Sequence, residues 1–408
     1  MKHTDKRLWF FASCIVISCL ALWFVFLRLA PSATNRKGDS KPIVALPTSL
    51  PEATATPTLD ERGTIIYDWK KEHPEAANVD WLNEGVWLKG ARPFYHPPSF
   101  SPDGRWIVGG TARPFLWDAR TGENKGTLGR SFYGNVFTNF KGVSFISNQE
   151  IALLQNHQVT VFALTLLPIA ETPKRPFYHS IGGCGPTSKQ GIWTYSYDIY
   201  DANLVKNLPK AERRLRYWDY KNARFTRVLP ASLLEPVFSR DSRINMPVKI
   251  RENKHWLAVE RRCYGIFVLN RSYKKVWQEI VSCPPLAPII TDKELPILAD
   301  FQLGAKNILY LLDQNKGLRR VNLKNGEEYK AWPLPNSATS FALSDDNKFW
   351  AFGNEEGRLL IVEAATRKII RNRVLPFSTE DINFSPDGSS IAVGGLVILP
   401  VLKSIQKD

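Results

Sequence analysis

Short segments with alternating apolar and polar positions follow one another along most of the chain, and tight-turn residues separate them. In residues 100–110 a Ser-Pro-Asp-Gly turn precedes the apolar run Trp-Ile-Val-Gly-Gly. In residues 384–395 the same turn precedes Ile-Ala-Val-Gly-Gly. A period of two residues is typical of β-strands, and Pro-Asp-Gly is typical of a tight turn between two strands. The pattern predicts an all-β fold built from repeated antiparallel units.

Weaker copies of this unit fill the chain between these two segments, and the third copy carries an insertion at 198–212. Each unit of such an array buries its apolar faces against its neighbours. The spacing therefore predicts one ring of seven units over residues 60–408. The turns between the first and second strand of each unit are expected near residues 103, 148, 189, 253, 305, 346 and 387.

The last unit ends near residue 402, after its third strand, so a fourth strand has to come from elsewhere. Residues 63–69, Gly-Thr-Ile-Ile-Tyr-Asp-Trp, are a strand-like segment without a partner at the start of the domain. Closing the ring removes exposed sheet edges. We therefore expect residues 63–69 to pair as the outer strand of the last unit.

The first unit also contains Trp117 and Asp118 directly before a turn with Thr-Gly, and Trp218 occupies the equivalent place in the third unit. Together with the Ser-Pro-Asp-Gly turns, these residues resemble the WD-repeat family. The resemblance implies a seven-bladed β-propeller that acts as a binding or scaffold protein, with both tryptophans in structural roles. An Asp that the family carries between its second and third strands is missing from residues 109–113. We therefore expect aromatic packing to hold the blades together.

The N-terminal part has a different pattern. Residues 8–27 are a run of 20 residues without a charge, between a short head at 1–7 and a segment at 28–59 rich in Pro, Ala, Ser and Thr. At about 1.5 Å per helical residue the run spans about 30 Å, the thickness of a bilayer core. It predicts a single transmembrane helix, followed by a flexible linker.

The orientation of this helix is not fixed by charge, because basic residues flank it on both sides. The seven-residue head has nothing to fold, which favours a signal anchor and places the propeller on the extracytoplasmic side of the membrane. Cleavage near residues 30–33 and lipidation of Cys19 are the alternatives.

The net charge of +15 over 408 residues is concentrated in one region. Residues 206–275 hold 18 Lys plus Arg against 6 Asp plus Glu. Such a region favours an anionic partner, although a solvated basic surface is the plain alternative. Arg213, Arg214 and Arg216, which follow the insertion, are candidate binding residues. Anionic lipid, acidic glycan or a protein partner fits a membrane-tethered domain better than nucleic acid does.

The pentapeptide Arg-Pro-Phe-Tyr-His occurs twice, at 92–96 and 175–179, each time expected just before the first strand of a unit. Its Arg and Tyr side chains would recognise an anionic or aromatic group. The alternative is that each His only forms hydrogen bonds within its own blade. The candidate binding residues are Arg92, Tyr95, His96, Arg175, Tyr178 and His179.

The sequence offers no reaction of its own. It has no Gly-x-Ser-x-Gly elbow, no His-Glu-x-x-His, no phosphate-binding loop and no zinc-ligand spacing, so we expect no catalytic residues, metal or cofactor. Asp103, Asp345 and Asp346 are assigned to turns. A propeller hydrolase or lyase whose central site is assembled from several blades remains the enzymatic alternative. An obligate component of an envelope assembly is a third.

Two cysteines are expected to be neighbours. Cys263 falls in the turn between the second and third strands of its unit, and Cys283 follows the fourth strand, which runs antiparallel to the third. If the domain is exported, the two thiols are candidates for a disulfide. Two unrelated thiols are the alternative.

Overall fold

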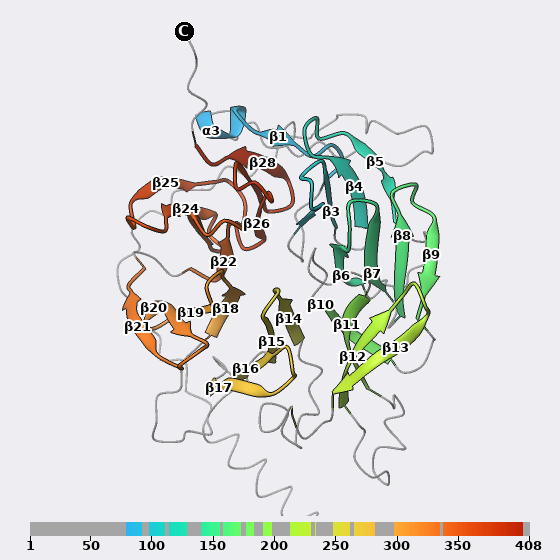
Figure 1. The fold of residues 1–408 in the computed structure, drawn as a ribbon. Helices are drawn as coiled ribbons and strands as arrows, with labels where there is room; N and C mark the ends of the chain where they lie inside the picture. Colours follow the sequence, from blue (N-terminus) through green and yellow to red (C-terminus); the bar gives the residue numbers. More distant parts are fainter. Residues whose placement is uncertain are drawn as a thin grey trace, which may run out of the picture. The chain divides into compact units, whose positions relative to one another are not determined.

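The computed structural model contains seven four-stranded antiparallel sheets, which stand around a common centre (Figure 1). Each sheet is one blade, and its strands follow chain order from the centre to the rim, except in the last blade. The structure describes residues 79–91, 98–110, 114–128, 140–155, 158–172, 177–182, 191–197, 213–229, 233, 248–261, 265–281, 298–334 and 338–402.

The first four blades are continuous in sequence. Blade 1 consists of β2 (Ser99–Phe100), β3 (Trp106–Gly110), β4 (Pro114–Asp118) and β5 (Asn124–Thr127), and blade 2 consists of β6 (Phe140–Phe145), β7 (Glu150–Gln155), β8 (Gln158–Ala163) and β9 (Pro168–Glu171). Blade 3 consists of β10 (Phe177–Gly182), β11 (Gly191–Tyr197), β12 (Arg213–Asp219) and β13 (Arg224–Leu229). Blade 4 consists of β14 (Val248–Glu252), β15 (Trp256–Arg261), β16 (Gly265–Asn270) and β17 (Lys275–Ile280).

The remaining three blades include the one that closes the ring. Blade 5 consists of β18 (Leu298–Leu303), β19 (Ile308–Asp313), β20 (Gly317–Asn322) and β21 (Glu328–Trp332). Blade 6 consists of β22 (Ser340–Leu343), β23 (Phe349–Gly353), β24 (Arg358–Glu363) and β25 (Ile369–Val374). Blade 7, which closes the ring, consists of β26 (Ile382–Phe384), β27 (Ser390–Val393), β28 (Val397–Pro400) and β1 (Val86–Trp87).

The ring is closed, because each innermost strand contacts the innermost strand of the next blade and β26 contacts β2. All seven predicted turns fall between the first and second strands of a blade, so the predicted seven-bladed propeller is confirmed. The insertion at 198–212 joins β11 to β12, as expected, and lies outside the described residues. The period of the sequence was sufficient to count the blades because every blade repeats the same meander.

The predicted closing strand is wrong. The outer edge of β28 is taken by β1, in which Val86 pairs with Ile398 and Trp87 with Val397. The single helical turn α3 (Asp80–Asn83) covers the rest of this edge, where the Trp81 indole donates to the Pro400 carbonyl at 2.9 Å. Two strand residues are enough because Trp81 and Leu82 are buried beside them. Residues 63–69 lie outside the described residues.

The chain after β1 is fixed to the first blade and so joins the two ends of the ring. The backbone N–H of Lys89 donates to the Gly122 carbonyl at 2.8 Å, and the Trp117 indole donates to the Lys89 carbonyl at 2.9 Å. Gly122 has φ +71°, and a Cβ there would lie 2.0 Å from the Trp87 carbonyl oxygen. Only glycine fits this position without moving β1.

Turns with Ser followed two residues later by Asp, including both Ser-Pro-Asp-Gly turns, share one hydrogen-bond pattern. In the first blade the Ser101 hydroxyl donates to Asp103 at 2.6 Å and accepts from the Trp106 N–H at 3.0 Å. The pattern recurs as Ser344 with Asp346 and as Ser385 with Asp387. The assignment of Asp103 and Asp346 to turns is therefore confirmed.

The blades are held together by aromatic packing, as expected, and also by polar contacts that the sequence did not predict. Trp117, Trp193, Trp218 and Trp350 are fully buried. Side chains on inner strands and turns also reach the backbone of the next blade. Examples are Asn383 to the Pro98 carbonyl at 3.0 Å, Gln302 to the Phe341 carbonyl at 3.0 Å, Asn253 to the Gly304 carbonyl at 3.2 Å and Ser340 to the Thr379 carbonyl at 3.1 Å.

The described residues contain no helix that is long and apolar enough to cross a bilayer. The predicted helix at 8–27, its linker at 28–59 and the rest of the chain before residue 79 lie outside those residues.

Candidate functional site

Polar side chains from four neighbouring blades gather near the starts of the innermost strands. This inner polar cluster consists of Lys249, Asp300, Thr339, Glu380 and Asp381. Lys249 on β14 forms an ion pair with Asp300 on β18. The hydroxyl group of Thr339, directly before β22, donates a hydrogen bond to Glu380 at 2.8 Å. Glu380 and Asp381 directly precede β26. Because every blade has four antiparallel strands, all innermost strands begin at the same face of the ring.

Asp300 has a structural part in this cluster. Its side chain is 9% exposed, and one carboxylate oxygen accepts the N–H of Phe341 in the next blade at 3.2 Å. The other oxygen accepts its neighbour's N–H, from Phe301, at 2.6 Å and also contacts Lys249. The carboxylate thereby connects three successive blades.

Asp381 is the group in this cluster with unusual protonation. Burial and, to a smaller extent, the negative charge of Glu380 raise the pKa of the Asp381 carboxyl to about 7, against the opposing positive charge of Lys249. A carboxyl group that exchanges its proton near neutral pH is suited to general acid–base chemistry or to donating a hydrogen bond to a ligand. The sequence showed only an acidic pair before a strand, and burial decided the rest.

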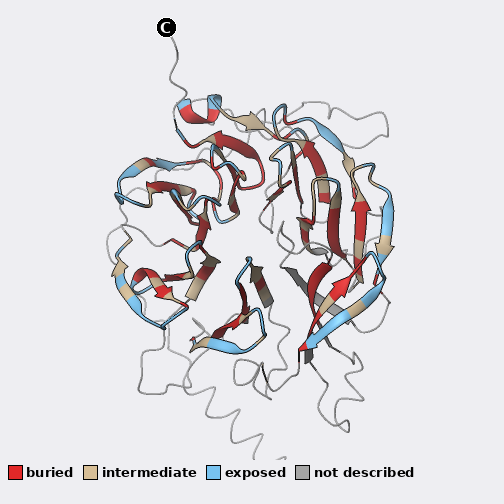
Figure 2. Ribbon diagram, viewed as in Figure 1, coloured by how far each residue is buried: buried red, intermediate tan, exposed pale blue. Residues whose placement is uncertain are grey.

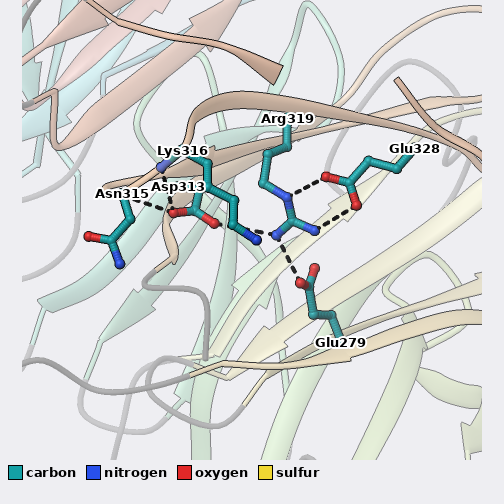
Figure 3. A network of polar contacts seen from close by, with 6 residues as sticks. All are labelled: Glu279, Asp313, Asn315, Lys316, Arg319 and Glu328. Atoms are coloured by element: carbon teal, nitrogen blue, oxygen red, sulfur yellow. Dashed lines mark hydrogen bonds and ion pairs between the residues drawn. The ribbon is translucent and has the colours of Figure 1, made fainter. Parts of the chain in front are cut away.

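Arg319 is the centre of a second polar network (Figure 3), between blades 4 and 5. Its guanidinium, on β20, donates to both oxygens of Glu328 on β21, at 2.7 and 2.9 Å, and to Glu279 on β17 at 2.8 Å. It also contacts Asp313 at 3.5 Å, and its side chain is only 6% exposed. Each of the three guanidinium nitrogens contacts a carboxylate, so this network acts as a clamp between two blades.

The pKa values within this clamp differ with burial. Burial raises the pKa of Glu279, and the hydrogen bond and positive charge of Arg319 reduce that rise. The hydrogen bond from Arg319 lowers the pKa of Glu328, against a smaller opposing effect of burial. The clamp is fully occupied by its own chain, which identifies it as structural.

The described part of blades 3 and 4 exposes basic side chains. Its four carboxylates are turned inward or paired: Asp219 is 7% exposed, Glu260 is 6% exposed, Glu252 pairs with Arg271, and Glu279 belongs to the clamp. The exposed basic residues, here called the basic rim, are Lys221, Arg224, Arg227, Lys254, Lys274 and Lys275.

Few of the predicted binding residues fall on described side chains. Arg216 on β12 is 8% exposed, and its guanidinium lies over the Phe225 ring at 5.7 Å. Arg213 and Arg214 are also on β12, but their side chains lie outside the described residues. The rim residues come from neighbouring turns and outer strands instead, and the charge count of the region indicated only that basic residues are in excess there.

The repeated pentapeptide is only partly described. Arg92, Tyr95, His96 and Arg175 lie outside the described residues. Tyr178 and His179 belong to strand β10 rather than to the connection before it, and the register shifts between Tyr178 and Ser180. The second copy therefore extends into a strand, which corrects its expected position.

Cys263 and Cys283 also lie outside the described residues. The strands on either side have the expected order, since Gly265 at the start of β16 pairs with Ile280 at the end of β17. Residues just after Cys263 and just before Cys283 are therefore adjacent.

Comparison with known proteins adds no relative: no protein-family model matches the chain, and no curated protein matches it significantly. The fold defines the class of protein, which is a seven-bladed β-propeller. Its sites have to be interpreted from their own geometry.

Proposed function

We propose that this chain is a membrane-tethered interaction module, related to WD-repeat propellers, which binds a protein partner at one face and an anionic partner at its basic rim. Residues 8–27 would supply the tether, with the propeller outside the cytoplasm. A closed ring is a rigid scaffold, and recognition residues of such scaffolds concentrate in their longer connections.

The distribution of connection lengths is the observation that carries this proposal. The face where the innermost strands begin is here called the connection face. At this face, long segments of the chain join one strand end to the next. The opposite face has short turns, such as 101–105 and 344–348. The long segments at the connection face are 129–139, 198–212, 230–247 and 282–297.

The pentapeptide supports the same face. Its first copy belongs to the connection between β1 and β2, and its second copy leads into β10. Residues 92–96 and 175–176 therefore belong to connections between blades, where side chains from neighbouring blades can meet one partner, while 177–179 begin strand β10.

Affinity capture from detergent-solubilised membranes, with mass spectrometry of what is retained, tests the proposal. The full chain is compared with the variant Arg92→Ala, Tyr95→Ala, His96→Ala and with the control Arg120→Ala, an exposed residue of the short turns. We expect the triple variant to lose a partner that the control retains. Identical sets of proteins in all three samples would contradict binding at the connection face.

The inner polar cluster favours a second candidate, a hydrolase or lyase with a central site. Asp381 would act as the acid or base, with Lys249 as a charged neighbour. A panel of ester, glycoside and uronide substrates tests it, because turnover that Asp381→Asn abolishes without unfolding the ring would establish an enzyme. Absence of turnover leaves the binding function.

A further inference from the structure

Side-chain contacts join the outer part of blade 3 to the outer part of blade 4. Arg227 on β13, the outer strand of blade 3, donates to the Tyr273 hydroxyl in blade 4 and lies over its ring at 4.8 Å from the centroid. Tyr273 in turn packs edge-on against Trp193 of blade 3 at 5.6 Å. These contacts link blade 3 to the turn that precedes β17, so exposed groups on β13 and at the start of β17 lie on neighbouring segments.

Basic side chains dominate this surface. Lys274 and Lys275 directly follow Tyr273 and are exposed, and Arg224 is exposed on β13. The nearest described carboxylates offset part of this charge, since Asp219 interacts with Arg224, and Glu252 interacts with Arg227 as well as with its partner Arg271, but neither carboxylate is exposed. The surface therefore presents positive charge without exposed acidic neighbours in the described part of these blades.

Aliphatic side chains are exposed among the basic groups. Val276 is 38% exposed and Ile280 is 47% exposed on β17, while Val228 is 44% exposed on β13. Figure 2 colours most of β13 as exposed, while β17 has both exposed and intermediate residues. Branched aliphatic side chains gain free energy only when a partner removes them from water.

This combination distinguishes between anionic partners. An acidic glycan or a nucleic acid would satisfy the positive charge but would leave Val276 and Ile280 in water. An anionic bilayer satisfies both, because its headgroups attract Lys and Arg while aliphatic tips enter the boundary between headgroups and acyl chains.

We infer that the outer edges of blades 3 and 4, with the basic residues Arg224, Arg227, Lys274 and Lys275 and the exposed aliphatic residues Val276 and Ile280, dock on a bilayer surface that contains anionic phospholipid. This deepens the anionic-partner half of the proposed function and rests on it. Docking would orient the ring on the membrane and leave the connection face available to a protein partner.

Hydrogen–deuterium exchange of the full chain tests this docking. The chain is placed in nanodiscs of phosphatidylcholine alone and in nanodiscs of phosphatidylcholine mixed with phosphatidylglycerol. We expect slower exchange in peptides covering 220–229 and 271–281 only in the anionic discs, and loss of that protection at high salt, since screening weakens headgroup attraction. Equal exchange in both discs would overturn the inference.

Charge variants locate the contact. Each lysine near an anionic surface contributes about fivefold to binding, so Lys274→Gln with Lys275→Gln should weaken docking by about thirtyfold. The matched control is Lys324→Gln with Lys330→Gln, two exposed lysines of blade 5, which should retain the protection. Equal losses in both variants would show a diffuse charge effect and overturn the assigned surface.

Apolar variants separate lipid from glycan. Val276→Ser with Ile280→Ser should reduce docking on anionic discs, and Ile369→Ser with Val374→Ser, two exposed positions on the outer strand of blade 6, should not. Protection by soluble heparin but not by anionic discs would overturn the lipid inference in favour of a glycan. If the chain did not insert into neutral discs at all, this result would contradict the proposed membrane tether. It would be distinguishable from a failure of docking, in which the chain inserts but its outer strands are not protected.

Discussion

Single residues in this propeller are defined by how completely their charge is compensated. Arg319 is almost fully buried, yet each of its three guanidinium nitrogens contacts a carboxylate. Asp381 is the opposite case, because burial and Glu380 both disfavour its charged form and only Lys249 favours it. Arg319 is therefore part of the structural framework, whereas the carboxyl group of Asp381 gains or loses its proton near neutral pH.

Removing Arg319 should be costly. In Arg319→Met, Asp313 and Glu279 stay buried without their cation, and breaking a buried ion pair from one side costs about 3–5 kcal/mol. Urea denaturation should show this loss in the free energy of unfolding. Arg373→Met, at an exposed position on β25, is the control and should change it by less than about 0.5 kcal/mol. Equal effects of the two substitutions would show that the clamp does not hold the blades.

Asp381 should make stability depend on pH. Its pKa is raised in the folded state, to about 7, so the folded protein holds this proton more tightly than the unfolded chain does. The ionised carboxyl therefore destabilises the fold increasingly as pH rises from about 4 to 7. The melting temperature of Asp381→Asn should exceed that of the wild type more at pH 8 than at pH 4. A constant difference across this range would contradict the raised pKa.

At the scale of elements, one of the two shortest strands described has the largest consequence. β1 has two residues, but Trp81 and Leu82 beside it are buried, and the Leu88 N–H donates to the Leu396 carbonyl at 2.9 Å. This segment completes the last blade and reaches the first, so it closes the ring that all other blades require.

Two truncations test this closure. Deleting residues 1–78 keeps α3 and β1 and should leave the thermal transition of the propeller in place. Deleting residues 1–90 removes the burial of Trp81, Leu82 and Leu88, at about 1.5–3 kcal/mol each, and should abolish cooperative unfolding. If the shorter truncation already unfolds the ring, residues 63–69 contribute to closure after all.

At the scale of the whole molecule, the redox state of Cys263 and Cys283 tests on which side of the membrane the propeller lies. The pairing of Gly265 with Ile280 brings the two connections together. If the propeller lies outside the cytoplasm, non-reducing mass spectrometry of protein from its native membrane should find the two cysteine peptides linked. Reduction should then lower stability by about 3 kcal/mol at most. Free thiols at both positions would favour a cytoplasmic propeller.

The repeat pattern by itself determined the blade count, the seven first turns and the structural roles of Trp117, Trp218 and Asp103. These features are local: a period of two, a Ser-Pro-Asp-Gly turn and a buried tryptophan recur within each blade, so neighbouring residues specify them. The local amino-acid composition also showed the concentration of basic residues between 206 and 275. The sequence could not assign those charges to exposed or buried positions, and Arg216 proved to be buried.

The tertiary structure decided which segment closes the ring, which charges are exposed and which carboxyl is perturbed. Residues 63–69 have the more regular strand pattern, yet Val86 and Trp87 take the edge because Trp81 and Gly122 fit the surfaces on either side. Lys249, Asp300 and Asp381 are far apart in the chain and are united by the ring alone. Pairing, burial and charge compensation depend on contacts between distant residues, and only the closed fold supplies those contacts.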